Sequence, residues 1–219
     1  AGFRAIGIDS RPQRRQIDDA PYAHYAIDLM DTTALEVLCT KFPVDVGLLV
    51  HAAAIQTLEA AGTGHVRSWV ESFSVNVLSV EILTSCLRNR LTQNSPNLVI
   101  SIGSVHEVLT SRKMAPYSVS KAALAAWVRA AAIDLAPDVR IVNLAPGATL
   151  TPMLQASLER SVTPDVALRN LEESLLPNRV LQAREVAKFC LELVLAPLPH
   201  LSGTTIRIDG GASIRLPGE

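Results

Sequence analysis

One apolar run constrains the fold of this chain more than any other feature. Residues 46–53 form an almost continuous apolar segment, and strands of this kind are buried on both faces of a parallel sheet. Further strand-like segments alternate with helical patterns: strands at 3–8, 98–103, 139–144 and 204–208, and helices at 34–42, 66–91, 117–136 and 184–195. Such alternation indicates βαβ units. The sequence therefore predicts an α/β fold with a doubly wound parallel sheet, built as a single domain over residues 1–219.

The composition argues against several classes of protein. The 219 residues carry a net charge of −1 with acidic and basic residues interspersed, so there is no electrostatic footprint for nucleic acid. The stretch 122–133 comes closest to a membrane span, but Arg129 interrupts it well short of the ~18 residues required. Cys39, Cys86 and Cys190 have neither metal-ligand nor disulfide spacing. We expect no nucleic acid, membrane or metal partner, and a location in the reducing cytoplasm.

A phenol and an amine stand at helical spacing in the segment Tyr117-Ser-Val-Ser-Lys121. Positions i and i+4 of a helix share a face, with Cβ atoms about 5–6 Å apart. A cation at that distance is expected to lower the pKa of Tyr117 toward the range of an acid or base catalyst. The alternative interpretation is an amphipathic helix with one aromatic residue and one exposed lysine, because such pairs also arise by chance.

The segments around this pair resemble the short-chain dehydrogenase/reductase family, from residue 2 to about residue 211. The matching segments stand in the family's order: Trp69 with Val75-Asn76-Val77, the strand 97–104 that ends in Ser104, the helix 116–121, the Pro-Gly turn 142–147 with Thr149 and Thr151, and the closing-strand segments 202–203 and 208–211. The resemblance implies a Rossmann-like domain. It also implies hydride transfer between NAD(P) and a small-molecule alcohol or ketone.

The resemblance assigns a catalytic role to four residues. Tyr117 would donate a proton to the carbonyl oxygen during reduction and accept it during alcohol oxidation. Lys121 would lower the pKa of Tyr117 and hold the nicotinamide ribose hydroxyls, and Ser104 would donate a hydrogen bond to the substrate oxygen. Asn76 would hold a water that links Lys121 to solvent; the alternative is a polar residue that kinks its helix.

The cofactor implied by the resemblance is NAD, with NADP possible. Asp9 looks like the acid that binds the ribose hydroxyls and repels a 2′-phosphate, whereas Arg11 would favour that phosphate by pairing with it. Asp28 resembles an adenine-contacting residue, and a turn at a strand end is a second role that is compatible with the first. The expected cofactor contacts are Asp9, Asp28, Leu29, Ala52, Ala53, Ile102, Tyr117, Lys121, Pro146, Gly147, Thr149 and Thr151.

The chain departs from the family pattern at two places. A Gly-rich phosphate turn should precede Asp9 by about 20 residues, so that turn and the first strand are not in this sequence. We expect an N-terminal piece to precede these residues; the alternative is a shortened, cofactor-free scaffold or partner subunit. His51-Ala-Ala-Ala54 stands in place of Asn-Asn-Ala-Gly, with His51 either a hydrogen-bonded structural residue or a base. His106 and Glu107 are expected at the surface, with contact to the substrate as the alternative.

Residues 152–177 are expected to form short helices that act as a lid over the substrate. Their apolar side chains favour a steroid, aromatic or fatty-chain alcohol, and residues 146–155 resemble bacterial 3α-hydroxysteroid dehydrogenase/carbonyl reductases. A hydroxysteroid or general carbonyl compound is the first expectation, and a 3-oxoacyl thioester the second. As in the resembled family, the helices 66–91 and 117–136 are expected to pair across a homo-oligomer.

Overall fold

The structure, a computed structural model, describes residues 3–12, 22–196 and 198–214. Its strands are β1 (Ala5–Asp9), β2 (Tyr22–Ala26), β3 (Leu48–His51), β4 (Leu98–Ile102), β5 (Arg140–Pro146), β6 (Thr149–Leu150), β7 (Leu181–Gln182) and β8 (Thr205–Ile208). Its α-helices are α1 (Thr32–Thr40), α2 (Val66–Phe73), α3 (Ser79–Gln93), α4 (Ala115–Asp134), α5 (Pro152–Leu158), α6 (Pro164–Glu173) and α7 (Ala183–Leu195). The other helical segments are the π-helical η1 (Ser74–Leu78) and the 3-10 segments η2 (Val105–Glu107) and η3 (Pro199–Leu201).

The strands are parallel. β3, β4, β5 and β8 form one sheet in that order, and β1 pairs with β2 in a second sheet. Parallel strands joined through helices confirm the predicted α/β, doubly wound, Rossmann-like fold. The register places Ser101 of β4 between His51 of β3 and Asn143 of β5, so three polar side chains meet in one row of the sheet.

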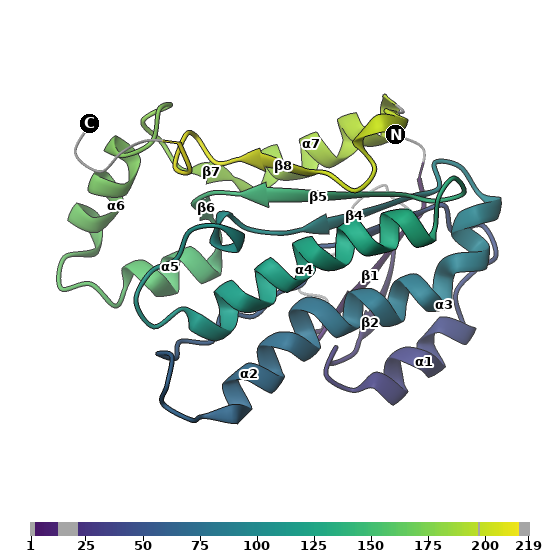
Figure 1. Cartoon of the computed structure of the whole chain (residues 1–219), viewed down its shortest axis with the longest axis horizontal. Helices are drawn as coiled ribbons and strands as arrows, with labels where there is room; N and C mark the ends of the chain where they lie inside the picture. The colour runs from purple at the N-terminus through teal and green to yellow at the C-terminus, as the bar shows by residue number, and fades with distance from the viewer. Residues whose placement is uncertain (1–2, 13–21, 197, 215–219) are drawn as a thin grey trace.

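Helices cover both faces of the four-stranded sheet (Figure 1). On one face α3 and α4 pack against the strands and α1 packs beside α3, in a core that contains Leu87 and Val99. On the other face α7 packs through Leu193 onto Leu98 and Ile100. Neighbouring residues of β4 therefore alternate between two apolar cores, as expected for a central strand of a parallel sheet.

One helical stretch runs without a break from Val66 to Gln93 and contains η1 in its middle. The sequence pattern predicted a helix over 66–91 but not the π turn within it. By length and composition alone this stretch is long and apolar enough to cross a membrane. From the sequence, no segment of that kind was expected. Its side chains Val80, Leu83 and Leu87 are buried in the protein core, which explains the apolar composition.

Residues 152–177 form the short helices α5 and α6, as predicted, and lie at the end of the sheet toward which β5 and β8 point (Figure 1). Ligands of open α/β sheets bind at this carboxyl edge. The segment is anchored where it ends, because Leu175 is buried and Leu176 donates its N–H to the Gly210 carbonyl over 2.9 Å. Val162, between the two helices, is 99% exposed.

Candidate active site

Tyr117 and Lys121 lie one turn apart on α4 and are both buried, with 6% and 1% of their surfaces exposed. Pro116 occupies the first turn of the helix, where its missing amide proton costs no hydrogen bond. The Nζ atom of Lys121 lies 5.8 Å from the centroid of the Tyr117 ring and donates to the carbonyl of Ile102 over 2.8 Å. The helix therefore brings the phenol and the amine together.

Ser104 joins this pair from the segment that follows β4. It is 7% exposed and caps η2, where its Oγ accepts the backbone N–H of His106 over 3.2 Å. The His106 ring packs edge-on against the Tyr117 ring, with centroids 5.5 Å apart. Because the Ser104 oxygen accepts the His106 N–H, its hydroxyl proton is available to a phenol or substrate oxygen.

Burial shifts the pKa values of Tyr117 and Lys121. Burial raises the pKa of Tyr117, and the hydrogen bond from Ser104 offsets this only in part. Burial also lowers the pKa of Lys121 to about 8, although the Glu107 carboxylate raises it. The prediction that Lys121 lowers the pKa of Tyr117 is therefore wrong for this structure. The physical reason is that burial removes the hydration that would stabilise the phenolate, and the charge of Lys121 is not among the causes that act on the Tyr117 pKa.

Asn76 is completely buried within η1 and uses its side-chain amide for three hydrogen bonds. Its Oδ1 accepts the Ile55 N–H over 2.9 Å, and its Nδ2 donates to the Ile55 carbonyl over 3.0 Å and to the Ser120 Oγ over 2.9 Å. Ser120 in turn donates to the carbonyl of Tyr117 over 2.7 Å. Both amide protons are used, so Asn76 can hold a water only through an oxygen atom.

His51 ends β3 and is 4% exposed, with its Nε2 atom 2.8 Å from the Ser79 Oγ. The Ser79 hydroxyl donates its proton to the Val75 carbonyl over 2.7 Å, so the oxygen must accept from His51. This fixes the Nε2–H tautomer. Burial, helped by the charge of Lys121, lowers the pKa of His51 to about 3. The geometry favours the hydrogen-bonded structural residue over the catalytic base.

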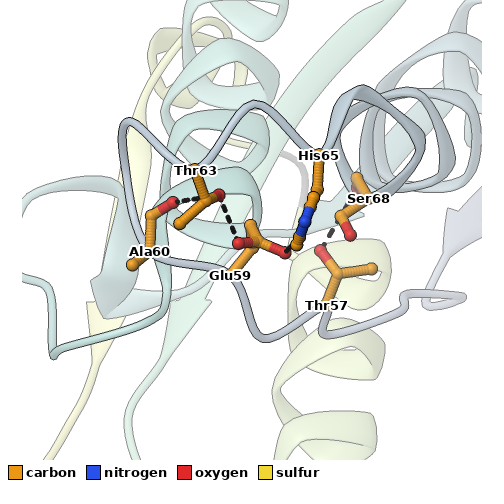
Figure 2. Close-up of polar contacts among 6 residues, drawn as sticks. All are labelled: Thr57, Glu59, Ala60, Thr63, His65 and Ser68. Carbon is orange, nitrogen blue, oxygen red and sulfur yellow. Dashed lines mark hydrogen bonds and ion pairs between the residues drawn. The ribbon is translucent and has the colours of Figure 1, made fainter.

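The loop between β3 and α2 is held against the start of α4. The backbone of Glu59 pairs with that of Met114, three residues before Tyr117. The Glu59 carboxylate accepts a hydrogen bond from Thr63 and pairs with the Nδ1 atom of His65 over 2.8 Å, as Figure 2 shows. These contacts close the loop on itself and set its position beside the first turn of the helix that carries Tyr117.

The Pro-Gly turn follows β5 directly. A Cβ atom on Gly147 would lie 2.8 Å from the Cα of Asp209 at the end of β8, so only glycine fits there. Thr149 donates its hydroxyl to the Gly147 carbonyl over 3.0 Å, and Thr151 caps α5. Pro146, which ends β5, is buried.

A cavity of about 320 Å³ lies beside this turn. Its lining residues include Leu175, Arg179, Leu181, Arg207 and Asp209 but neither Ser104 nor Tyr117.

The residues expected at the adenosine end of a cofactor lie at the carboxyl ends of β1 and β2, which are parallel neighbours. Asp9 is exposed, and its Oδ1 accepts the N–H of Arg11 over 2.9 Å. The Oδ1 of Asp28 accepts the N–H of Met30 over 2.9 Å, so Asp28 has the turn role expected of a residue at a strand end. Leu29 is buried, with 6% of its surface exposed.

The donors of Lys121 fit a cofactor with neighbouring hydroxyls. An ammonium carries three protons, and the Ile102 carbonyl takes one of them. Within the described part of the chain no second hydrogen bond of Lys121 is formed, which leaves two protons for ribose hydroxyls. Ala52 and Ala53, which follow β3 at the same edge of the sheet, are exposed and half-buried. These residues fit the nicotinamide half of NAD(P).

A family model described as Enoyl-(Acyl carrier protein) reductase matches residues 10–213, which is most of the chain. The chain belongs to the short-chain dehydrogenase/reductase family. The resemblance of its motifs to this family is thereby confirmed. The matched range includes all four residues with an expected catalytic role, Ser104, Tyr117, Lys121 and Asn76.

Relatives support this membership. Cyclopentanol dehydrogenase of Comamonas testosteroni is 30% identical over 164 residues, which are 74% of this short-chain dehydrogenase/reductase and 64% of the relative. The 3beta-hydroxysteroid dehydrogenase 1 of Eggerthella lenta is 26% identical over 224 residues, covering 98% of this chain and 83% of the relative. In structure, 4-hydroxyisoleucine dehydrogenase complexed with NADH has a TM-score of 0.85 at 19% identity, covering 98% and 90% of the two chains. The match to cyclopentanol dehydrogenase thus spans just under two thirds of that protein.

Some residues of the site were placed wrongly from the sequence. His106 and Glu107, expected at the surface, are half-buried, because one packs on Tyr117 and the other accepts from the Asn143 Nδ2 over 3.0 Å. Asn143 lies 36 residues from Glu107, so no local pattern marks the contact.

Among residues 3–12, 22–196 and 198–214, no three His, Cys, Asp or Glu side chains gather as metal ligands.

Proposed function

We propose that this protein is an NAD(P)-dependent oxidoreductase that transfers a hydride between nicotinamide and an alcohol or ketone. The observation that carries the proposal is the convergence of Ser104, Tyr117 and Lys121 in one buried cluster at the carboxyl edge of the sheet. A protonated phenol, a hydroxyl donor and an ammonium are the groups that carbonyl reduction needs. Membership in the short-chain dehydrogenase/reductase family supports the same chemistry.

Tyr117 is the proton donor in this mechanism. Burial raises the pKa of Tyr117, so the phenol holds its proton near neutral pH and can give it to a carbonyl oxygen. Ser104 donates its hydroxyl to the same oxygen, whose negative charge grows in the transition state. Bound NAD(P)H supplies the hydride. In alcohol oxidation the same two side chains act in reverse, with Tyr117 taking the proton.

Lys121 holds the nicotinamide ribose through the two protons that Ile102 leaves free. Its ammonium also returns protons to Tyr117, and a water held by an oxygen of Asn76 connects it to solvent. Ile102, Ala52, Ala53, Pro146 and Gly147 line the nicotinamide end, together with Thr149 and Thr151. Asp9, Asp28 and Leu29 line the adenosine end.

NAD is the preferred cofactor in this proposal. The exposed carboxylate of Asp9 accepts from ribose hydroxyls and repels a 2′-phosphate. The backbone N–H of Arg11 donates to Asp9. The guanidinium of Arg11 is exposed and would favour NADP by pairing with the 2′-phosphate. Asp9 decides the preference for NAD, because its carboxylate would repel the 2′-phosphate of NADP.

The substrate is a hydroxysteroid or a general carbonyl compound, with a 3-oxoacyl thioester as the second candidate. Apolar residues support the first class, since Leu154, Leu158 and Leu171 in the lid segment 152–177 are half-buried rather than packed away. Two relatives are named for a cyclic alcohol and a hydroxysteroid. The family model is described as Enoyl-(Acyl carrier protein) reductase, which shares with the second class the acyl thioester but not the 3-oxo group.

A homo-oligomer is the proposed assembly. Apolar side chains stand exposed along the two long helical stretches: Val66 and Val70 on α2 are 69% and 54% exposed, and Ile133 on α4 is 78% exposed. Exposed apolar side chains on a helix favour contact with another copy, and Val66 and Val70 share one face of α2 because they stand four residues apart. Light scattering tests this, and a monomeric mass at micromolar protein would count against it.

The test of the proposed function is turnover. The protein is expected to oxidise or reduce a panel of cyclic alcohols, hydroxysteroids and ketones with NAD(H), followed at the absorbance of NADH. A titration of NADH fluorescence distinguishes an NAD(P)-dependent enzyme from a cofactor-free scaffold or partner subunit. Saturable binding supports the enzyme, whereas no binding at millimolar NADH supports the scaffold.

A further inference from the structure

The loop between β3 and α2 carries a group of polar contacts that centres on Glu59 and has no part in the mechanism above (Figure 2). The Glu59 side chain is 12% exposed. One of its carboxylate oxygens accepts the hydroxyl of Thr63, and the other lies 2.8 Å from the Nδ1 atom of His65. His65 stands directly before α2. A single carboxylate therefore joins the start of this loop to its end.

The carboxylate is ionised where it makes these contacts. The hydrogen bond from Thr63, and after it the pairing with His65, hold the pKa of Glu59 below its usual range. The Thr63 hydroxyl also lies 3.0 Å from the carbonyl of Ala60, so the contacts reach the backbone of the loop as well. Both carboxylate oxygens are thus engaged within the loop.

The loop needs such a tie because its own backbone is permissive. Gly62 and Gly64 have φ angles of 81° and 77°, in the left-handed region that glycine adopts more readily than any other residue. Two glycines so close together give a free segment many conformations, and ordering it costs entropy. Glu59 and His65 stand on either side of the two glycines, so their pairing restricts the segment that contains both.

The backbone of Glu59 extends the tie to α4. Its N–H donates to the carbonyl of Lys113 over 2.8 Å, and its carbonyl accepts the N–H of Ala115 over 3.2 Å, on either side of Met114. Ala115 is the first residue of α4 and stands two residues before Tyr117. The residue whose carboxylate orders the loop is therefore also the residue whose backbone holds the start of the helix.

The start of α4 depends on support of this kind. Lys113 has a φ of 63°, and a residue with a Cβ atom keeps that conformation only where the surrounding contacts impose it. Met114, at the N-cap position, has no side-chain oxygen for the free N–H groups of the first turn. The next turn is held separately, because Lys121 donates to the carbonyl of Ile102 over 2.8 Å.

We propose that Glu59 is a positioning residue for Tyr117. Its two side-chain hydrogen bonds order the loop, and the backbone of the loop fixes the first turn of α4, from which the phenol projects beside the His106 ring. Glu59 acts through Tyr117 and does not contact the substrate. The proposal rests on the proposed function, because Tyr117 is the proton donor there.

Hydrogen exchange of the full chain tests the structural half of the proposal without turnover. Glu59→Ala removes both side-chain contacts and keeps the backbone groups. The amides of Ala115 and Ser118, which donate to the Glu59 and Met114 carbonyls, are expected to exchange about tenfold faster or more. The amide of Val128, buried further along α4, should keep its protection. Unchanged exchange at Ala115 and Ser118 would overturn the proposal.

Glu59→Gln is the conservative variant. Its amide oxygen can accept the Thr63 hydroxyl, and its amide nitrogen can donate to a neutral His65 ring. Both hydrogen bonds are therefore kept while the charge is removed, and exchange is expected as in the wild type. Thr63→Val removes one of the two contacts and should give an increase smaller than that of Glu59→Ala. A Glu59→Gln variant as fast as Glu59→Ala would contradict a role through hydrogen bonds.

Turnover tests whether the first turn of α4 matters to the reaction. In Glu59→Ala a displaced phenol should lower kcat roughly 10- to 100-fold, while the dissociation constant of NADH stays within about threefold of the wild type. Glu59→Gln should restore kcat. Glu71→Ala is the matched control with unchanged kcat, because the Glu71 carboxylate pairs over 2.7 Å with Arg67 of its own helix. A merely structural role of Glu59 would lower the free energy of unfolding and leave kcat per folded molecule unchanged.

The two proposals fail in different ways. Absence of turnover in the wild type with every substrate and cofactor contradicts the proposed function, and hydrogen exchange still decides whether Glu59 holds the first turn of α4. Wild-type turnover that Glu59→Ala does not diminish refutes the positioning role and leaves the proposed function standing.

Discussion

The Nδ2 atom of Asn76 donates to the hydroxyl of Ser120 over 2.9 Å and so ties the π-helical turn to the helix that carries Tyr117. The same amide holds both backbone groups of Ile55 in the loop after β3. A π turn places one extra residue in a helix, which changes the direction of the side chains at that point. Here it turns Asn76 into the space between β3 and α4, where all three contacts are made.

Asn76→Ala is therefore expected to destabilise the protein. It leaves the backbone N–H and carbonyl of Ile55 without their partners and removes a donor to Ser120, each at a cost of about 1–3 kcal/mol when buried. Urea unfolding at pH 7 measures the change. Asn89→Ala, on the exposed face of α3, is the control and should change stability by about 0.5 kcal/mol or less. Equal effects of the two variants would contradict the role given to Asn76.

Tyr117→Phe tests the proton donor. The phenyl ring keeps the packing against His106 but has no proton to give, so turnover should fall by at least ~100-fold. NADH binding, followed by fluorescence, should remain, because the ring itself is kept. Tyr25→Phe, which alters a tyrosine that packs on Phe42 away from the site, should retain turnover. Undiminished turnover in Tyr117→Phe would remove this residue from the mechanism.

The pH dependence of stability tests the burial of Lys121. Its pKa is about 8 in the folded protein and 10.5 when unperturbed, so the folded form loses its proton first as pH rises. The buried ammonium therefore costs stability fully below pH 8, and the cost is relieved between pH 8 and 10.5, by on the order of 3 kcal/mol. Lys121→Met should lack this relief, seen as a difference from the wild type in urea unfolding. Lys188→Met, at an exposed position, should follow the wild type.

The fold could be predicted from the sequence because its signals are local. The apolar run at 46–53 and the helical pattern at 117–136 each correspond to an observed element, with ends that differ by two residues. The spacing of Tyr117 and Lys121 also sufficed to bring the two together, since a helix fixes which side chains share a face. Neither inference needed a contact between distant segments.

The electrostatics and the supporting contacts could not be predicted in the same way. The pKa of Tyr117 depends on how deeply the phenol is buried, which spacing along the helix does not reveal. Glu107 and Asn143 are 36 residues apart and meet only because β4 and β5 are neighbours in the sheet. The π turn around Asn76 has no periodic signal, and its stabilising partners lie 21 and 44 residues away.

Asp9→Asn tests the choice of cofactor. The asparagine can still accept the backbone N–H of Arg11 through its side-chain oxygen, so the turn is kept while the negative charge is removed. Loss of repulsion toward a 2′-phosphate, worth about 1 kcal/mol or more, should raise the preference for NADP over NAD by about fivefold or more. The ratio of kcat/KM with the two cofactors measures this, and the ratio of their dissociation constants checks it without turnover. Asp138→Asn, at another exposed carboxylate, should leave the ratio unchanged. If Asp9→Asn shows the wild-type ratio, the ribose does not contact Asp9.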